Sequence, residues 1–190
     1  MSESPTRQLA DEHEYVKMVV GAMDQEVAYI ERTGRVHAER VAQMIDFTRN
    51  FTDGNHHAKE EDLLFPLLEE RSAAAGGTVS VLLSEHEAAR GCIRAIDAAL
   101  PDAERSAAAR GVVVENLKLY AYLLPLHIGK EDTVLFPLAD EVLGEDDRRR
   151  LAEEFARLEA DEVNAGVRER YHALARALAE APPDDSEGSA

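Results

Sequence analysis

Apolar residues recur at steps of three and four along most of the chain, which is the period of an amphipathic helix. The clearest case is the first segment, where the repeating positions are Leu9, Val16, Val19, Val20, Met23, Val27 and Ile30. Breaker residues and runs of small residues separate this segment from three others. The pattern therefore predicts four long helices with short connections, over about residues 6–34, 35–71, 78–100 and 102–143.

Local signals refine these helices. Thr6 is the expected N-cap of the first one, because a threonine hydroxyl can accept a hydrogen bond from a free backbone N–H. Asp53 and Gly54 interrupt the pattern of the second helix. We still predict that helix to be continuous, since the corresponding point of the fourth helix has no such break. Pro66 and Pro137 are expected to kink their helices, because proline removes a backbone hydrogen bond.

A further helical pattern follows Gly144. Over residues 145–180 one face is apolar and consists of Phe155, Leu158, Val163, Val167, Tyr171, Leu174 and Leu178. We predict one additional C-terminal helix that packs with this face on the other four. Residues 181–190 are polar and rich in proline, glycine and acidic side chains, so we expect a disordered tail.

Two stretches of the chain repeat one motif. Residues 56–66 and 127–137 align without a gap as H-x-x-K-E-[DE]-x-[LV]-L-F-P, and a Glu-His-Glu segment precedes each of them. A unit of two helices, roughly residues 9–70 and 82–141, is therefore duplicated. The expected fold is all-α: an up-down four-helix bundle with an internal two-fold repeat over residues 6–143, plus the additional C-terminal helix.

Composition and charge limit the partners. The 190 residues carry a formal net charge of -17, which argues against nucleic acid because such partners need basic patches. No stretch approaches the ~18 apolar residues of a membrane span, and the N-terminal residues lack the apolar core of a signal peptide. With a lone cysteine, Cys92, that cannot form an internal disulfide, we expect a cytoplasmic protein. The oligomeric state does not follow from the sequence.

Equivalent places in the two repeats carry four histidines and two glutamates: His13, His56, Glu60, His86, His127 and Glu131. A spacing of four places the histidine of each motif beside its glutamate, about 5 to 6 Å away. Buried groups of this kind are costly unless paired or metal-bound, so we predict that these six residues bind metal. Imidazole and carboxylate suit iron, zinc, copper or nickel. If both glutamates bridge, two metals share them, two histidines fall to each, and open positions remain for a small molecule.

Two further residues are candidates for a supporting layer. His57 and Glu61 are also four apart. The gapless repeat assigns His56 and Glu60 as ligands. His57 is then either exposed to solvent or a residue that orients a ligand. Tyr120 lies seven residues before the histidine of the fourth helix, on the same face. It either packs in the core or hydrogen-bonds to the centre, or even ligates it.

The doubled motif resembles the hemerythrin-like family of bacterial type, the HHE cation-binding domain. The resemblance covers roughly residues 9–141, and the six predicted ligands match the family pattern H…HxxxE…H…HxxxE down to the trailing Leu-Phe-Pro. It implies a non-haem di-iron centre, with two iron ions joined by oxo or hydroxo and carboxylate bridges. Such a centre reacts with oxygen, peroxide or nitric oxide, in oxidative or nitrosative stress or in iron handling.

The chain departs from the oxygen-carrying hemerythrins at two points. Arg90 stands where they have a further histidine, and Glu131 replaces an aspartate at a longer spacing. Both differences argue against simple reversible oxygen carriage. Three functions stay open: a protein that binds or senses a diatomic or peroxide ligand, an enzyme that decomposes peroxide like a catalase or reduces nitric oxide, and a metal-free helical interaction module. The sequence assigns no catalytic residue.

Overall fold

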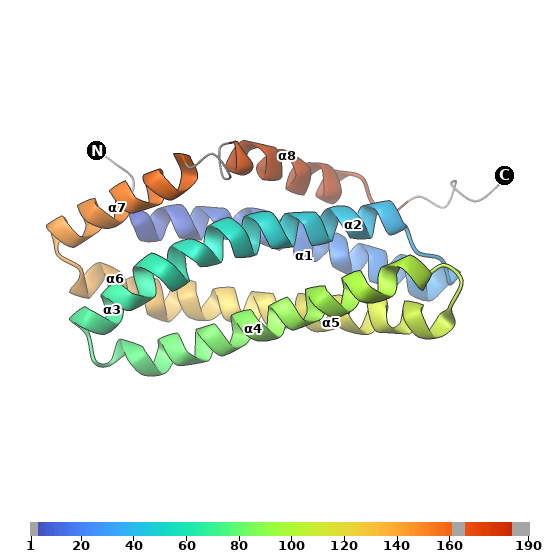
Figure 1. Cartoon of the computed structure of the whole chain (residues 1–190), viewed down its shortest axis with the longest axis horizontal. Coiled ribbons are helices and arrows are strands. Elements are labelled where there is room, and N and C mark those ends of the chain that lie inside the picture. The colour runs from blue at the N-terminus through green and yellow to red at the C-terminus, as the bar shows by residue number, and fades with distance from the viewer. Residues whose placement is uncertain (1–3, 161–165, 184–190) are drawn as a thin grey trace.

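The computed structural model describes residues 4–160 and 166–183, which are helical apart from short turns and contain no strand. The all-α prediction is confirmed for this part of the chain. The helices form long rods that lie side by side, and successive rods run in opposite directions (Figure 1). No helix within the described ranges combines the length and the apolar character needed to cross a membrane.

Each rod is one helix or a series of helices joined end to end. The first is α1 (Pro5–Thr33) and the third is α4 (Ala75–Ala99), which continues into the short 3-10 helix η3 (Leu100–Asp102). The second rod consists of α2 (Ala38–Phe47), the π-helices η1 (Thr48–His57) and η2 (Glu60–Leu64), and α3 (Phe65–Arg71). The fourth consists of α5 (Ala107–Lys130), the π-helix η4 (Glu131–Leu135) and α6 (Phe136–Val142).

The π-helices η2 and η4 have a cause in the sequence. Pro66 and Pro137 each follow one of them, and proline cannot donate to the carbonyl four residues back and clashes with it. The helix widens just before each proline, so Phe65 donates its N–H to the carbonyl of Glu60, five residues back, and Phe136 donates in the same way to Glu131. The second rod is continuous across Asp53 and Gly54, as expected from the sequence, but it passes them as a π-helix.

Several predicted helix ends are wrong, including the starts of the second and fourth helices, which begin at Ala38 and Ala107. Thr6 is not the N-cap of α1: Ser4 holds that place, and the Thr6 hydroxyl donates to Asp140 Oδ1 over 2.7 Å. The third helix begins at Ala75 rather than at about 78. The single helix predicted over 145–180 is instead two, α7 (Glu145–Ala160) and α8 (Val167–Glu180). Gly166 has φ 76°, a left-handed conformation that an α-helix does not contain.

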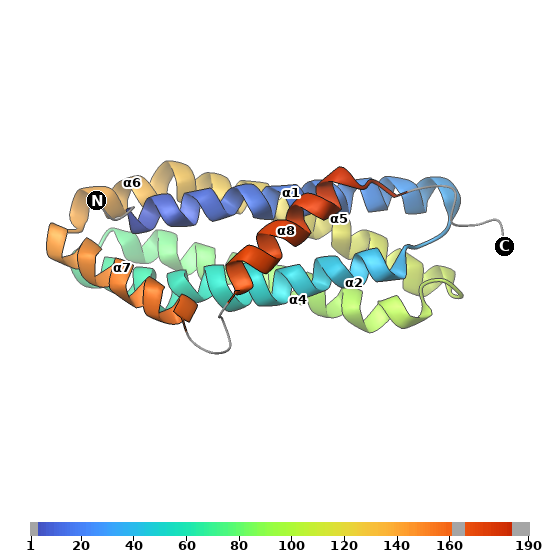
Figure 2. The ribbon, with the colours of Figure 1, turned by 90° about the horizontal axis from the view of Figure 1, so that it is seen from above.

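Helices α7 and α8 lie along the side of the rods that α1 and α2 form, and α4 and α5 lie on the opposite side (Figures 1 and 2). Buried side chains of both helices, Phe155 of α7 and Tyr171 of α8, belong to the apolar core. The disordered tail predicted for residues 181–190 falls largely on 184–190, outside the described residues.

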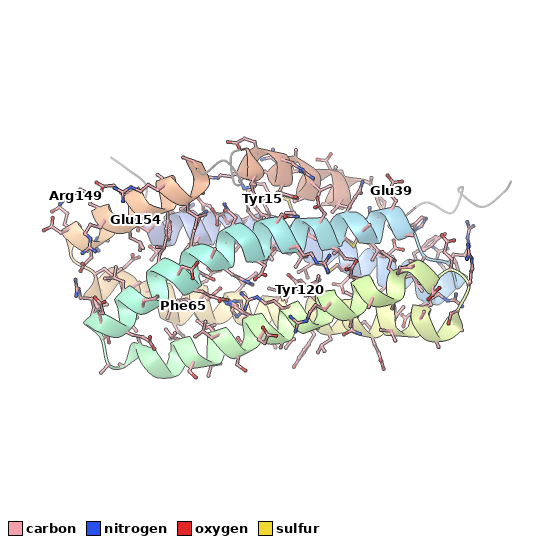
Figure 3. All side chains as sticks on the ribbon, in the orientation of Figure 1. Tyr15, Glu39, Phe65, Tyr120, Arg149 and Glu154 are labelled. Carbon is pink, nitrogen blue, oxygen red and sulfur yellow. The ribbon has the colours of Figure 1, made fainter. Side chains whose placement is uncertain are left out.

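The core consists of two apolar clusters with a polar layer between them. Phe65 belongs to one cluster and Tyr120 to the other, and both are labelled in Figure 3. Every rod crosses from one cluster to the other: on α1, for example, Leu9 belongs to the first and Val16 to the second. The histidine and glutamate positions of all four rods lie at this crossing, as His13 does between Leu9 and Val16. The fold thus brings them to one level of the molecule.

Candidate metal centre

Seven buried side chains meet in the polar layer, and each is at most 3% exposed. They form two groups that share Glu60, and within each group one ligand atom per residue lies within 4.8 Å of all the others. The first group is His13, His56, Glu60 and Glu131, and the second is His57, Glu60, His86 and His127. The structure therefore brings all six predicted ligands together and adds His57.

The two glutamates lie between the groups. Glu60 Oε1 is 3.7 Å from His56 Nε2, and its other oxygen is 3.6 Å from His86 Nε2. Glu131 repeats the arrangement, because one oxygen is 3.2 Å from His13 Nε2 and the other is 3.1 Å from His127 Nε2. Each carboxylate thus presents one oxygen to each group, which is the disposition of a bridging ligand.

The oxygen atoms of these two carboxylates are buried without hydrogen-bond partners. All four, and His13 Nε2 with them, are in this state among the described residues. A buried polar atom without a partner costs about 1 to 3 kcal/mol, and more when it is charged. Cations coordinated by these oxygens would remove that cost, so the donor set fits metal ions.

Each imidazole is oriented by a carboxylate at its other nitrogen. An ionised carboxylate only accepts hydrogen bonds, so Nδ1 of each ring donates and Nε2 is the nitrogen that faces the centre. The Nδ1–oxygen distances are 2.9 Å for His13 to Asp132, 2.9 Å for His56 to Glu12, 2.7 Å for His86 to Glu61, 3.0 Å for His127 to Glu85 and 3.3 Å for His57 to Asp53. Second partners of this kind fix the ring and strengthen it as a metal ligand.

Two lysines of the repeated motif hold two of these outer carboxylates. Lys59, whose side chain is fully buried, donates to Glu12 over 2.5 Å and to Glu159 of α7 over 2.6 Å. Lys130 donates to Glu85 at the equivalent place of the other repeat, but its side chain is 41% exposed. Helix α7 therefore covers the ion pair of Lys59 and Glu12, whereas the similar pair of Lys130 and Glu85 stays partly exposed.

The pKa values follow from burial and these contacts. Burial lowers the pKa of His56 to about 4 and that of His57 to about 3, which keeps both rings neutral as metal binding requires. Burial also lowers the pKa of His13, but its hydrogen bond with Asp132 and the adjacent carboxylate of Glu131 outweigh this and raise the pKa to about 9. Burial raises the pKa of Glu12, yet His56 and Lys59 together lower it to about 2.

The pKa values of Glu60 and Glu131 are shifted in opposite directions. Burial and the neighbouring charge of Glu131 raise the pKa of Glu60. Burial acts in the same direction on Glu131, but the adjacent imidazoles of His127 and His13 outweigh it and lower its pKa. Two acidic groups this close do not ionise equally without added positive charge, which again suits a cation between them.

His57 lies closer to the centre than the sequence indicated. Its ring stacks on His86 with centroids 3.7 Å apart, and the side chain is 3% exposed. The gapless repeat did not assign His57 as a ligand, because the residue that matches it in the fourth rod is Ile128. The signal that could have revealed it is Asp53, four residues earlier, which supplies the same outer carboxylate that the other rings have.

Tyr120 packs in the core, 1% exposed, beside the same part of the site. Burial raises the pKa of its hydroxyl, while the neighbouring Thr48 and Thr52 hydroxyls oppose this. Together with Thr48 and His57 it lines a small cavity of about 120 Å³. No described contact joins Tyr120 to a histidine or glutamate of the two groups, so its supporting role stays a prediction.

Most of the chain matches a known family. Residues 4–139 match the family described as hemerythrin HHE cation binding domain. The chain belongs to this family. The HHE domain is a metal-binding domain, and the two histidine and glutamate groups of this chain are arranged so that they could hold metal.

Relatives of this HHE protein add no named activity. It is 26% identical over 148 residues to the uncharacterized proteins Rv1995 of Mycobacterium tuberculosis and Mb2018 of Mycobacterium bovis. The match covers 77% of this chain but 58% of each relative, so the chain spans little more than half of their length. No solved structure matches significantly.

Proposed function

We propose that this HHE protein holds two iron ions and binds or reacts with a small molecule: oxygen, peroxide or nitric oxide. The observation that supports it best is the pair of buried glutamates whose four oxygens lack partners and face imidazole nitrogens on both sides. Imidazole and carboxylate without thiolate suit iron. When bound, the ions would supply redox chemistry toward oxygen species.

In this proposal the seven buried side chains are the ligands. His13 and His56 hold one ion, His57, His86 and His127 hold the other, and Glu60 and Glu131 bridge the two. The expected division of two histidines to each ion thus becomes two and three. Asp132, Glu12, Asp53, Glu61 and Glu85 keep the five rings in the tautomer that leaves Nε2 available.

We also infer that the four rods form an up-down four-helix bundle made of two copies of one helical pair. The outer contacts support this because they repeat with the motif. The glutamate before His13 binds the imidazole of His56, and the glutamate before His86 binds that of His127. The acidic residue after each bridging glutamate reaches across to the other copy, where Glu61 binds His86 and Asp132 binds His13.

Metal analysis with a visible spectrum tests the proposal on aerobically purified protein. We expect two irons per chain and a near-ultraviolet band of bridged ferric iron. Glu60→Ala and Glu131→Ala should each lose both ions, since each removes a bridge, whereas His57→Ala should keep one. His37→Ala is the control, because His37 binds Glu26 away from the centre. Protein that stays metal-free after iron loading would contradict the proposal and favour an interaction module.

Addition of peroxide to the same sample separates binding from turnover. For a binding protein we expect a reversible spectral change with oxygen or nitric oxide and no continuing consumption of the ligand. Sustained oxygen evolution from peroxide would instead identify a catalase-like enzyme. Steady consumption of nitric oxide in the presence of a reductant would identify a nitric oxide reductase.

A further inference from the structure

Arg90 ties together the carboxylates that orient two neighbouring imidazoles. Its Nε donates to Asp53 Oδ1 over 2.7 Å, and one terminal nitrogen donates to Glu61 Oε1 over 2.5 Å. These are the same oxygen atoms that accept from His57 and His86, at 3.3 Å and 2.7 Å. One guanidinium therefore fixes the positions of both acceptors, and the two rings that they hold are stacked.

This arrangement has no counterpart in the other repeat. The position that matches Arg90 is Lys17, which pairs with the exposed Glu14 on its own helix. The position that matches Asp53 is Leu124. Arg90, Asp53 and His57 therefore make the difference between the two halves of an otherwise duplicated site.

Asp53, His57 and Glu61 form a third group with the spacing of metal ligands. The guanidinium of Arg90 already provides the positive charge between the two carboxylates of that group. A paired, bidentate arginine of this kind holds planar acceptors in a fixed geometry. This group is therefore a clamp on the neighbouring imidazoles and needs no third ion.

The cavity beside His57 makes such a clamp necessary. It has a volume of about 120 Å³ and is lined by His57, Arg90 and Tyr120 among others. Protein interiors are normally close-packed, which holds a buried side chain in one orientation. The open space beside His57 would allow its imidazole to adopt a second orientation. The hydrogen bond between His57 and Asp53 is the longest of the five that hold the rings.

We propose that Arg90, acting through Asp53 and Glu61, is the positioning residue that keeps His57 and His86 on the centre and thereby makes the two metal positions unequal. This inference rests on the proposed metal site. Arg90 itself would not be a metal ligand. Without it, Asp53 loses its partner and the ring of His57 turns into the cavity, so the second ion keeps one imidazole fewer.

Titration of the metal-free protein with cobalt(II) tests the proposal by calorimetry and absorption spectroscopy. We expect two ions in the wild type. In Arg90→Met the affinity for one ion should fall about 10- to 100-fold, the usual effect of losing an outer partner, while the other ion binds as before. Asp53→Ala should behave in the same way, and Lys17→Met, the matched control, should bind both ions unchanged. Equal weakening of both ions in Arg90→Met, or no weakening, would overturn the proposal.

Imidazole nitrogen NMR of the metal-free protein gives a readout that requires no metal. In the wild type His57 should show one tautomer, with the proton on Nδ1. Arg90→Met should give averaged nitrogen shifts for His57 while His13 and His56 keep theirs. An unchanged His57 signal would refute the clamp. A wild type that binds no cobalt but shows this NMR change would refute the metal site and leave the clamp standing.

Discussion

At the residue scale, the outer partners of the imidazoles differ in how they are buried, although they come from repeated positions. Glu12 and Lys59 are both fully buried, and Glu159 is the further partner of the lysine. Glu85 and Lys130 form the equivalent ion pair, but both side chains are partly exposed to solvent. A buried ion pair leaves an uncompensated charge when one partner is removed, whereas an exposed pair contributes little.

Glu12→Gln should therefore lower the free energy of unfolding of the metal-free protein by on the order of 3 kcal/mol, and Glu85→Gln by less than about 1 kcal/mol. Urea unfolding at pH 7 measures both. The pKa of Glu12 is lowered from 4.5 to about 2, so its stabilising effect is present above pH 4.5 and fades as the pH falls toward 2. Equal losses for the two variants would show that burial by α7 does not matter.

At the element scale, π-helices carry several of the side chains that reach the centre: His56 and His57 end η1, and Glu60 and Glu131 begin η2 and η4. Adjacent residues of an α-helix point about 100° apart, so two neighbours such as His56 and His57 would face different parts of the interior. Both are buried at the end of η1. The wider turn of a π-helix rotates successive side chains by a smaller angle, and such turns are frequent at functional sites.

Gly54 lies in this π-helix, and a Cβ built on it would approach the Arg49 carbonyl oxygen to 3.0 Å. Replacing glycine by alanine within a helix usually raises the free energy of unfolding by up to about 1 kcal/mol. Gly54→Ala should not bring this stabilisation, and it should weaken metal binding at His56 and His57. Gly111→Ala is the control, since nothing lies within 4 Å of its Cβ position in α5. Thermal unfolding and cobalt titration of both variants test this. Stabilisation of Gly54→Ala with full metal binding would contradict it.

At the scale of the whole molecule, α7 and α8 share the apolar core of the rods, and we expect them to unfold together with the rods. Phe155 of α7 is fully buried in the cluster that contains Leu9, Leu64 and Leu135. Its ring also lies beneath the Lys59 ammonium, 5.8 Å from the ring centroid. The segment outside the duplication thus completes one apolar cluster and covers the lysine that holds Glu12.

Phe155→Ala should destabilise the protein by about 3 to 5 kcal/mol, the usual cost of emptying a buried aromatic position. Tyr122→Ala, which removes an aromatic ring that is 67% exposed, should cost less than about 0.5 kcal/mol. Urea unfolding followed by circular dichroism checks both. Two separate transitions in the wild type would mean that α7 and α8 unfold independently of the rods.

The sequence was sufficient for the features that depend on period and repetition. Apolar spacing along each segment determines the helices, and the duplicated motif determines that His13, His56, Glu60, His86, His127 and Glu131 converge, because equivalent faces of amphipathic helices must share one core. Helix ends were less predictable. Thr6 proved to bond Asp140, far along the chain, and Gly166 divided the last helix.

Only the tertiary structure decided the partners of each side chain. It brought His57 beside His86, paired each imidazole with a carboxylate from another rod or an earlier turn, and placed Glu159 on Lys59. Spacing along a helix fixes which residues share a face, but it does not fix the rotation of that face after a widened turn. Nor does it identify which distant element will lie opposite, since this depends on the packing of the whole chain.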